Sequence, residues 1–207
     1  MKISKKSLLA AILALLVLTA ACSAPAQSSS SSPASPSGPS QSPSSQASPS
    51  SEEDTPLLGS FTATDLDGNE VDQSIFADYD LTMINIWGTF CGPCLKEMPD
   101  LGQIHKEYAD KKVQVVGIVI DTLNRDGTIS QSQVDTAKEI VAKTGADYLH
   151  LLPSSDLIRL KLGEVSAVPE TIFVDKTGAL VGSSYLGAKS KSSWTDIIDK
   201  LLNSLES

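Results

Sequence analysis

WGTFCGPCLKEMP, residues 87–99, places two cysteines three positions apart, with glycine and proline between them. The preceding run, residues 81–87, is apolar and has the length of a strand at the centre of a sheet. From Cys91 onward the apolar residues recur at near-helical spacing, and Pro93 has the fixed φ that suits a first helical turn. The segment therefore predicts a buried strand, a short turn and a helix that begins at Cys91.

A cysteine at the start of a helix has a distinctive chemistry. The unpaired N–H groups of the first turn and the helix dipole favour an anion, so Cys91 is expected to ionise easily. Lowering a thiol pKa from about 8.5 to ~7 requires ~2 kcal/mol, which a helix N-terminus can supply. Cys94 lies one turn further in and is expected to be the shielded, resolving thiol.

Other roles for the cysteine pair fit the sequence less well. The chain has three cysteines, so if Cys22 is modified, Cys91 and Cys94 can bridge only each other within one molecule. A loop of four residues would contribute only about 2 kcal/mol as a covalent staple. A structural zinc site needs four ligands, and the chain has no second CxxC and only His105 and His150. Zinc stays as an alternative, and a redox pair is preferred.

The N-terminus resembles a secretory leader. MKISKK is basic, and residues 8–18 form an apolar run that is too short to cross a bilayer, which needs ~20 helical residues. Thr19-Ala20-Ala21-Cys22 resembles the lipobox of bacterial lipoproteins, although that pattern favours Leu at the position of Thr19. We expect a leader over residues 1–21 and a diacylglycerol group on Cys22. The alternative is ordinary cleavage after Ala21, which leaves a free thiol.

A tether is expected to follow the leader. Residues 23–51 contain 15 Ser and 6 Pro and no charged residue, so this stretch cannot bury enough apolar surface to fold. We assign residues 22–54 to a disordered tether and residues 55–207 to a single domain. The formal net charge is -9, or -12 without Lys2, Lys5 and Lys6. An acidic chain repels phosphate backbones, so we expect no nucleic-acid partner and membrane attachment through acyl chains.

The rest of the domain reads as a sheet with covering helices, hence an α/β class. The expected elements are a hairpin over 61–71, a buried strand over 113–121, a loop over 122–132, a helix around 134–141 that Gly145 ends, a hairpin over 171–186 and an amphipathic helix over 194–205. The Asp67-Gly68-Asn69 turn of the first hairpin is preferred over half of a calcium loop. The 122–132 loop either recognises a partner or has no role.

Three segments carry a family resemblance: residues 85–99, residues 115–121, and Ala167-Val-Pro-Glu-Thr-Ile-Phe-Val-Asp175. They resemble the TlpA/ResA-like, membrane-tethered thiol-disulfide oxidoreductases of thioredoxin fold, and the resemblance covers residues 57–205. It implies a thioredoxin-like fold, with a central mixed sheet flanked by helices and an N-terminal hairpin extension. Thioredoxin itself has a buried aspartate where this chain has Asn85, so the resemblance implies that another group manages the proton.

The resemblance also implies roles for individual residues. Glu97, one turn after Cys94, is the candidate for proton transfer, and the alternative is a solvated surface pair of Lys96 and Glu97. Pro169 corresponds to a cis proline that faces the disulfide in this fold, and Val168 would offer its backbone to an extended substrate.

Three more residues, Trp87, Gly92 and Pro93, complete the expected substrate-binding site. Gly92 and Pro93 would border the substrate, and Trp87 would either shield the cysteine pair or fill the core. Glu170 occurs in the cytochrome c maturation branch of the family but does not settle a pathway. His105 and His150 are expected on a helix surface and at a strand end, outside the catalytic site.

The expected function is that of a reductase of protein disulfides, because Gly92-Pro93 is the dipeptide of the reducing thioredoxins. The clients would be apocytochrome c, a methionine sulfoxide reductase or wrongly oxidised proteins, and an integral membrane thiol carrier would donate electrons. We expect an extracytoplasmic monomer, lipid-anchored to a bacterial membrane, with no metal and no cofactor besides the Cys91–Cys94 disulfide. The alternatives are a copper-binding lipoprotein that uses the two thiolates, and a binding lipoprotein in which the pair is vestigial.

Overall fold

The computed structural model describes residues 56–206 of the chain. The predicted leader, the predicted lipidation site Cys22 and the predicted tether up to residue 54 lie outside the described residues. Among the described helices, none combines the length and the apolar character that a membrane span requires.

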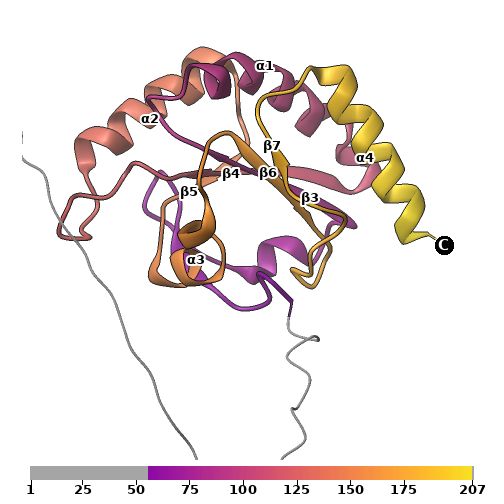
Figure 1. Ribbon diagram of the computed structural model, residues 1–207, viewed down its shortest axis with the longest axis horizontal. Helices are drawn as coiled ribbons and strands as arrows, with labels where there is room; N and C mark the ends of the chain where they lie inside the picture. Colours follow the sequence, from indigo (N-terminus) through magenta and orange to yellow (C-terminus); the bar gives the residue numbers. More distant parts are fainter. Residues whose placement is uncertain (1–55, 207) are drawn as a thin grey trace, which may run out of the picture. The chain divides into compact units, whose positions relative to one another are not determined.

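A five-stranded mixed sheet forms the centre of the domain (Figure 1). The strands follow the order β5 (Leu149–Leu151), β4 (Val113–Val119), β3 (Leu81–Trp87), β6 (Glu170–Val174) and β7 (Tyr185–Leu186). β3, β4 and β5 run parallel, whereas β6 and β7 are antiparallel to their neighbours. The thioredoxin-like α/β architecture predicted from the sequence is therefore confirmed.

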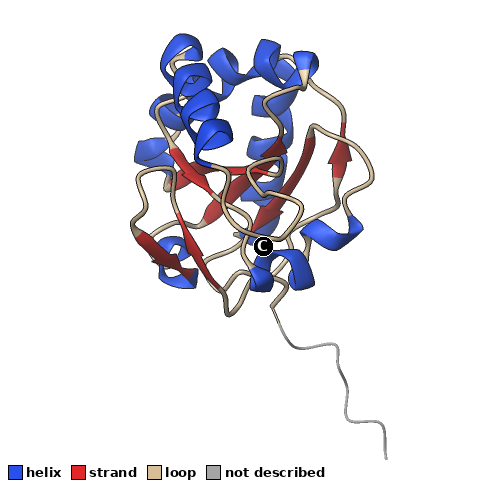
Figure 2. Ribbon diagram, turned by 90° about the vertical axis from the view of Figure 1, so that its left-hand side faces the viewer, coloured by secondary structure: helices blue, strands red, loops and turns tan. Residues whose placement is uncertain are grey.

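Two layers cover the sheet, one on each face. Three long helices lie on one face: α1 (Gly92–Glu107), α2 (Gln131–Thr144) and α4 (Lys191–Leu205) (Figures 1 and 2). The other face carries α3 (Ser155–Leu160) and the hairpin of β1 (Thr62–Thr64) and β2 (Glu70–Asp72). Every residue of β3 and β4 is buried because both faces are covered.

The N-terminal hairpin forms as predicted. β1 and β2 pair antiparallel, and the Asp65 carboxylate accepts hydrogen bonds from the backbone N–H groups of Asp67 and Asn69 and from the Asn69 side chain. These donors occupy the carboxylate of Asp65, so the turn is held by its own side chains, as Asx-type turns are.

Several elements differ from the sequence-based expectation. β5 and α3 were not expected from the sequence. β5 spans three residues and α3 six, and such short elements show no clear hydrophobic period. The return strand of the last hairpin is reduced to β7 and an isolated bridge between Val174 and Leu180. The loop predicted over 122–132 ends earlier, because α2 begins at Gln131. Within this loop, a β-bridge joins Leu123 to Ile129.

Gly117 offers a test of the packing between β4 and β5. It faces His150 in the parallel register, and a Cβ on Gly117 would lie 2.2 Å from His150 Nδ1. We expect Gly117→Ala to lower the free energy of unfolding by about 1–3 kcal/mol, as overpacking of a core does. Urea denaturation of the oxidised protein measures this change.

Gly92→Ala is the matched control, because a Cβ on Gly92 meets nothing within 4 Å. Equal stabilities for the two variants would show that the His150 side chain moves aside without cost.

Candidate active site

Cys91 and Cys94 form a disulfide at the start of α1. The S–S distance is 2.01 Å and the two Cα atoms are 5.3 Å apart. Cys91 is the N-cap of α1, with extended backbone angles, and its Sγ accepts a hydrogen bond from the Cys94 N–H at 3.2 Å. The helix therefore begins directly after Cys91, as predicted, and the Cys94 N–H of its first turn points toward the Cys91 sulfur.

The two sulfurs differ in their access to solvent. Cys94 is completely buried, whereas Cys91 retains 5% of its surface. Around Cys91 the side chain of Phe90 is 69% exposed, and Gly92 and Pro93 are exposed as well. A second molecule that approaches the disulfide from the edge formed by these residues would meet Cys91 first.

The carboxylate of Asp121 holds the turn that directly precedes Cys91. Thr89 donates its backbone N–H and its hydroxyl to Asp121, with an Oγ1–Oδ2 distance of 2.5 Å. Gln133, in the first turn of α2, donates its Nε2 to the same carboxylate at 3.2 Å. Asp121 thus ties the 88–90 turn to β4 and α2. The sequence analysis missed this contact, because nothing in the pattern indicates that residues 89, 121 and 133 meet.

Glu97 lies on the buried side of α1, one turn after Cys94. Its side chain is 3% exposed, so the alternative of a solvated Lys96/Glu97 pair is wrong. Asn85 Nδ2 donates to Oε1 at 3.1 Å, and Oε2 accepts from Trp194 Nε1 at 3.3 Å and from the Lys189 N–H at 3.1 Å. Three elements, β3, α4 and the loop before α4, therefore converge on this carboxyl group.

The surroundings of Glu97 favour its protonated form. Burial raises the pKa of Glu97 above its ordinary value, and the hydrogen bonds from the Lys189 N–H, Asn85 and Trp194 only partly oppose this effect. A carboxyl group with a raised pKa can take up and release a proton closer to neutral pH than an exposed glutamate can.

Asn85 can serve both protonation states of Glu97. Its Nδ2 donates to Glu97 Oε1 and to Thr171 Oγ1, each at 3.1 Å, while its Oδ1 has no hydrogen-bond partner among residues 56–206. A half-turn of the amide would present Oδ1 to a protonated Glu97 and to the Thr171 hydroxyl, both of which can donate. The amide can therefore follow the proton without leaving its position.

Pro169 lies at the same edge of the sheet as the disulfide. β3 and β6 are antiparallel, with Ile86 opposite Glu170, so Pro169 lies next to the end of β3, from which the chain leads to Cys91. The Val168–Pro169 peptide bond is cis, as the family resemblance implies. Pro169 is buried and Val168 is half-buried. The predicted residues Cys91, Pro169 and Val168 therefore lie along one edge.

Glu170 is part of a buried ion pair that the sequence did not predict. Its Oε1 accepts from Lys161 Nζ and from Ser184 Oγ, each at 2.5 Å, and both charged side chains are almost completely buried. Lys161 ends α3 and Ser184 precedes β7. Glu170 thus anchors the segment 161–169, which leads into the cis proline.

Trp87 and the two histidines have structural contacts. Trp87 is completely buried, so the predicted substrate contact at Trp87 is wrong, and the residue fills the core. Its Nε1 donates to His150 Nδ1 at 3.2 Å, and His150 Nε2 lies 3.0 Å from the Ala146 carbonyl.

His150 is the buried middle residue of β5 and not a strand end, and burial lowers its pKa to about 4. His105 is half-buried and accepts from the Val115 N–H, so it is not a free surface residue.

Metal-ligating side chains do not gather within residues 56–206: no three His, Cys, Asp or Glu residues form a group there.

Comparisons with known proteins agree with this geometry. The profile of the Redoxin family matches residues 45–198. Thiol-disulfide oxidoreductase ResA of Bacillus thuringiensis subsp. konkukian (strain 97-27) is 25% identical over 122 residues, which are 59% of this chain and 64% of that protein. ResA of Bacillus anthracis is 25% identical over 143 residues, 69% of this chain and 75% of the relative. The chain thus spans less than two thirds of the first of these relatives.

A solved structure supports the fold. The thiol:disulfide interchange protein of the thioredoxin family from Chlorobium tepidum TLS has a TM-score of 0.59 and 24% sequence identity. The similarity covers 72% of this chain and 96% of that chain.

The buried Glu97 predicts a specific dependence of stability on pH. Its folded-state pKa lies above the ordinary 4.5, so the folded chain holds this proton more tightly than the unfolded chain. Its contribution to stability is therefore lost as pH rises from the ordinary pKa through the folded-state pKa. Glu97→Gln removes this loss, which amounts to about 1.4 kcal/mol for each unit by which the pKa is raised.

Urea denaturation of oxidised wild type and Glu97→Gln, from about pH 4 to about pH 8, measures the difference. The exposed Glu164→Gln is the control. A difference between wild type and Glu97→Gln that stays constant across the range would contradict the raised pKa.

Proposed function

This chain belongs to the Redoxin family, and from that membership we propose that it catalyses thiol–disulfide exchange on protein substrates through Cys91 and Cys94. The observation that carries the proposal is the disulfide at the N-terminus of α1, whose first sulfur alone reaches the surface. The names of the ResA relatives support the same activity.

The exchange proceeds in two displacements. In the reduced protein the Cys91 thiolate attacks one sulfur of a client disulfide, forms a mixed disulfide and releases the other client sulfur as a thiolate. The Cys94 thiolate then attacks Cys91 Sγ, and the second client sulfur leaves. The client has gained two electrons and, from the surroundings, two protons, while the protein has returned to the Cys91–Cys94 disulfide.

The role of Glu97 is to accept the proton of Cys94. Cys94 is buried, so its thiol cannot lose a proton directly to bulk water. Glu97 lies one helical turn further along the same helix and is itself shielded, and its raised pKa makes its ionised form a stronger proton acceptor than an exposed glutamate. Asn85 holds the carboxyl group in place during both states.

The client binds along the edge that contains Cys91 and Pro169. Gly92 and Pro93 are exposed beside Cys91, and the backbone of Val168 faces the same edge, where an extended client segment can lie.

The reaction runs as a reduction, because Gly92-Pro93 separates the cysteines as in reducing thioredoxins. A membrane-bound dithiol carrier restores the reduced state. The clients are disulfides of apocytochrome c, methionine sulfoxide reductase or wrongly oxidised proteins.

The location of this activity is extracytoplasmic. The basic, apolar N-terminus and the lipobox-like Thr19–Cys22 support export and lipid attachment at Cys22, and residues 22–54 then serve as the tether of a monomeric domain at residues 55–207.

Trapping of the mixed disulfide tests the mechanism directly. Cys94→Ser lacks the resolving thiol, so the protein should accumulate joined to its client through Cys91. Non-reducing electrophoresis and mass spectrometry identify the adduct and the client cysteine. Cys91→Ser is the control and should form at least about tenfold less adduct, because Cys94 is buried. Equal trapping by the two variants would reverse the assigned roles.

The ionisation of Cys91 gives an independent test. In the reduced protein the helix N-terminus should hold the pKa of Cys91 below about 8.5, the value of a free thiol. The rate of iodoacetamide alkylation, followed against pH in Cys94→Ser, reports this value. A midpoint at or above about 8.5 would remove the helix terminus as the source of reactivity.

A further inference from the structure

Three neighbouring cavities lead away from the disulfide, and each shares lining residues with the next. The first, of about 260 Å³, is lined by Phe90, Ile120 and residues 165–168. The second, of about 230 Å³, shares Ile120 and Val165 with the first. The third, of about 780 Å³, shares Leu123, Pro153 and Ile158 with the second. We call the whole the client groove.

The near end of the client groove is the proposed site of exchange. Phe90, directly before Cys91, and Val168, directly before Pro169, both line the first cavity. Phe90 is 69% exposed, so its apolar ring is available for contact with a second molecule. A segment whose sulfur is joined to Cys91 would therefore enter the groove with its neighbouring residues.

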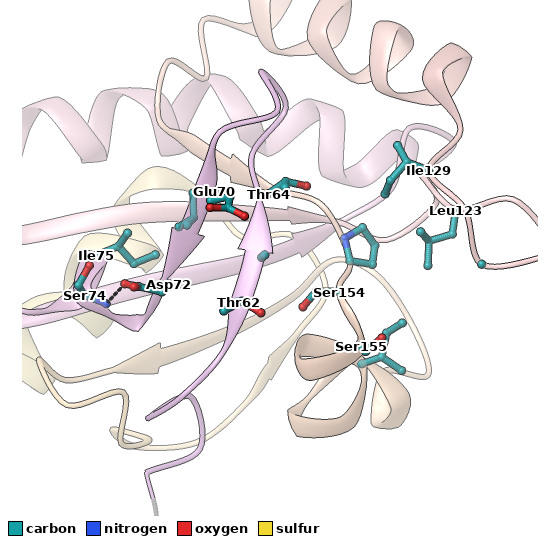
Figure 3. Close-up of a pocket in the computed structure, with 15 residues that line it drawn as sticks. Thr62, Thr64, Glu70, Asp72, Ser74, Ile75, Leu123, Ile129, Ser154 and Ser155 are labelled. Atoms are coloured by element: carbon teal, nitrogen blue, oxygen red, sulfur yellow. Dashed lines mark hydrogen bonds between the residues drawn. The ribbon is translucent and has the colours of Figure 1, made fainter.

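The middle of the client groove is apolar and preorganised. The bridge between Leu123 and Ile129 turns the segment 122–130 into a small hairpin, and the N–H of Asn124 donates to the Thr128 carbonyl at 2.8 Å. Figure 3 shows Leu123 and Ile129 together on this hairpin, beside the third cavity. Ile129, on the hairpin, is 40% exposed, and Ile158, on α3, is 41% exposed. Apolar side chains from two elements thus form one wall.

The far end of the client groove is acidic. Glu70 and Asp72 line it from β2, on the opposite side from Leu123 and Ile129 (Figure 3). Neither residue forms an ion pair among residues 56–206, and no Lys or Arg lines any of the three cavities. Hydrogen bonds from Ser74 lower the pKa of Asp72, so this carboxylate stays ionised.

We propose that the client groove binds an extended polypeptide segment of the client, with apolar side chains beside the reactive cysteine and a basic residue further along. This inference rests on the proposed function and names the chemistry of its substrate. Continuity with Cys91 explains why the segment is part of the client, the exposed isoleucines select apolar side chains, and Glu70 and Asp72 select the positive charge. It also gives the 122–130 hairpin a role.

Two peptides test the proposal, each of roughly twelve residues, about 40 Å when extended. Each carries one cysteine in a disulfide with glutathione, then isoleucine and valine residues and an Arg-Lys end, and the two differ in chain direction. The dithiothreitol-reduced protein is assayed with each peptide and with glutathione disulfide. We expect a higher kcat/KM for at least one peptide.

The variant Ile129→Ser/Ile158→Ser should lower the ratio of peptide to glutathione disulfide kcat/KM about tenfold, through KM. Leu205→Ser, an equally exposed leucine on α4, is the control and should leave the ratio unchanged. Glu70→Gln should lower the ratio for the Arg-Lys peptide and not for its Gln-Gln counterpart, and added salt should have the same effect.

The outcomes separate this proposal from the proposed function. If the wild type exchanges with no substrate, the proposed function fails, and a cysteine-free peptide still tests the groove. That peptide should shift the amide NMR signals of residues 123–129 and 158 in the oxidised protein. Unchanged signals, a ratio unaffected by the double variant, or a dimer in sedimentation that the double variant dissociates would each overturn the client groove.

Discussion

The junction between β3 and α1 is the constraint on which the site depends. β3 is the middle strand, with neighbours on both sides and cover on both faces, so its end cannot shift without disturbing the core. Thr89, held by Asp121, fixes the short turn that follows, and α1 begins immediately after Cys91. Cys91 therefore stands at a rigid position, where the first N–H groups of a helix stabilise negative charge.

The buried carboxyl group of Glu97 links this junction to the rest of the domain. Burial of an ionisable group raises the free energy of the folded state. Hydrogen bonds from Asn85, Trp194 and the Lys189 backbone N–H partly offset this cost. Because these donors come from β3, from α4 and from the loop before α4, the C-terminal helix belongs to the site although it is remote in sequence. The same arrangement makes the protonation of Glu97 sensitive to any change in the packing of α4.

The face of the sheet that carries α3 and the N-terminal hairpin borders the proposed client groove. The ion pair of Lys161 and Glu170 holds the segment that ends at the cis proline, and the same segment lines the groove that starts at Phe90. The N-terminal hairpin closes the far end of this groove with acidic residues. The hairpin, α3 and the 122–130 segment thus line the proposed client groove in addition to covering the core.

The sequence alone determined the parts of this protein that depend on neighbouring residues. The apolar run 81–87, the helical spacing after Cys91 and the capping Gly145 rest on local periodicity and turn chemistry, and all three predictions are confirmed. β5 and α3 escaped prediction because elements of three and six residues are too short to show a period. The burial of Trp87 and Glu97, and the meeting of Asp121 with Thr89 and Gln133, were decided only by the tertiary structure. These contacts join residues 12 to 97 positions apart, and a local pattern carries no information about which distant side chains share a buried, weakly solvated space.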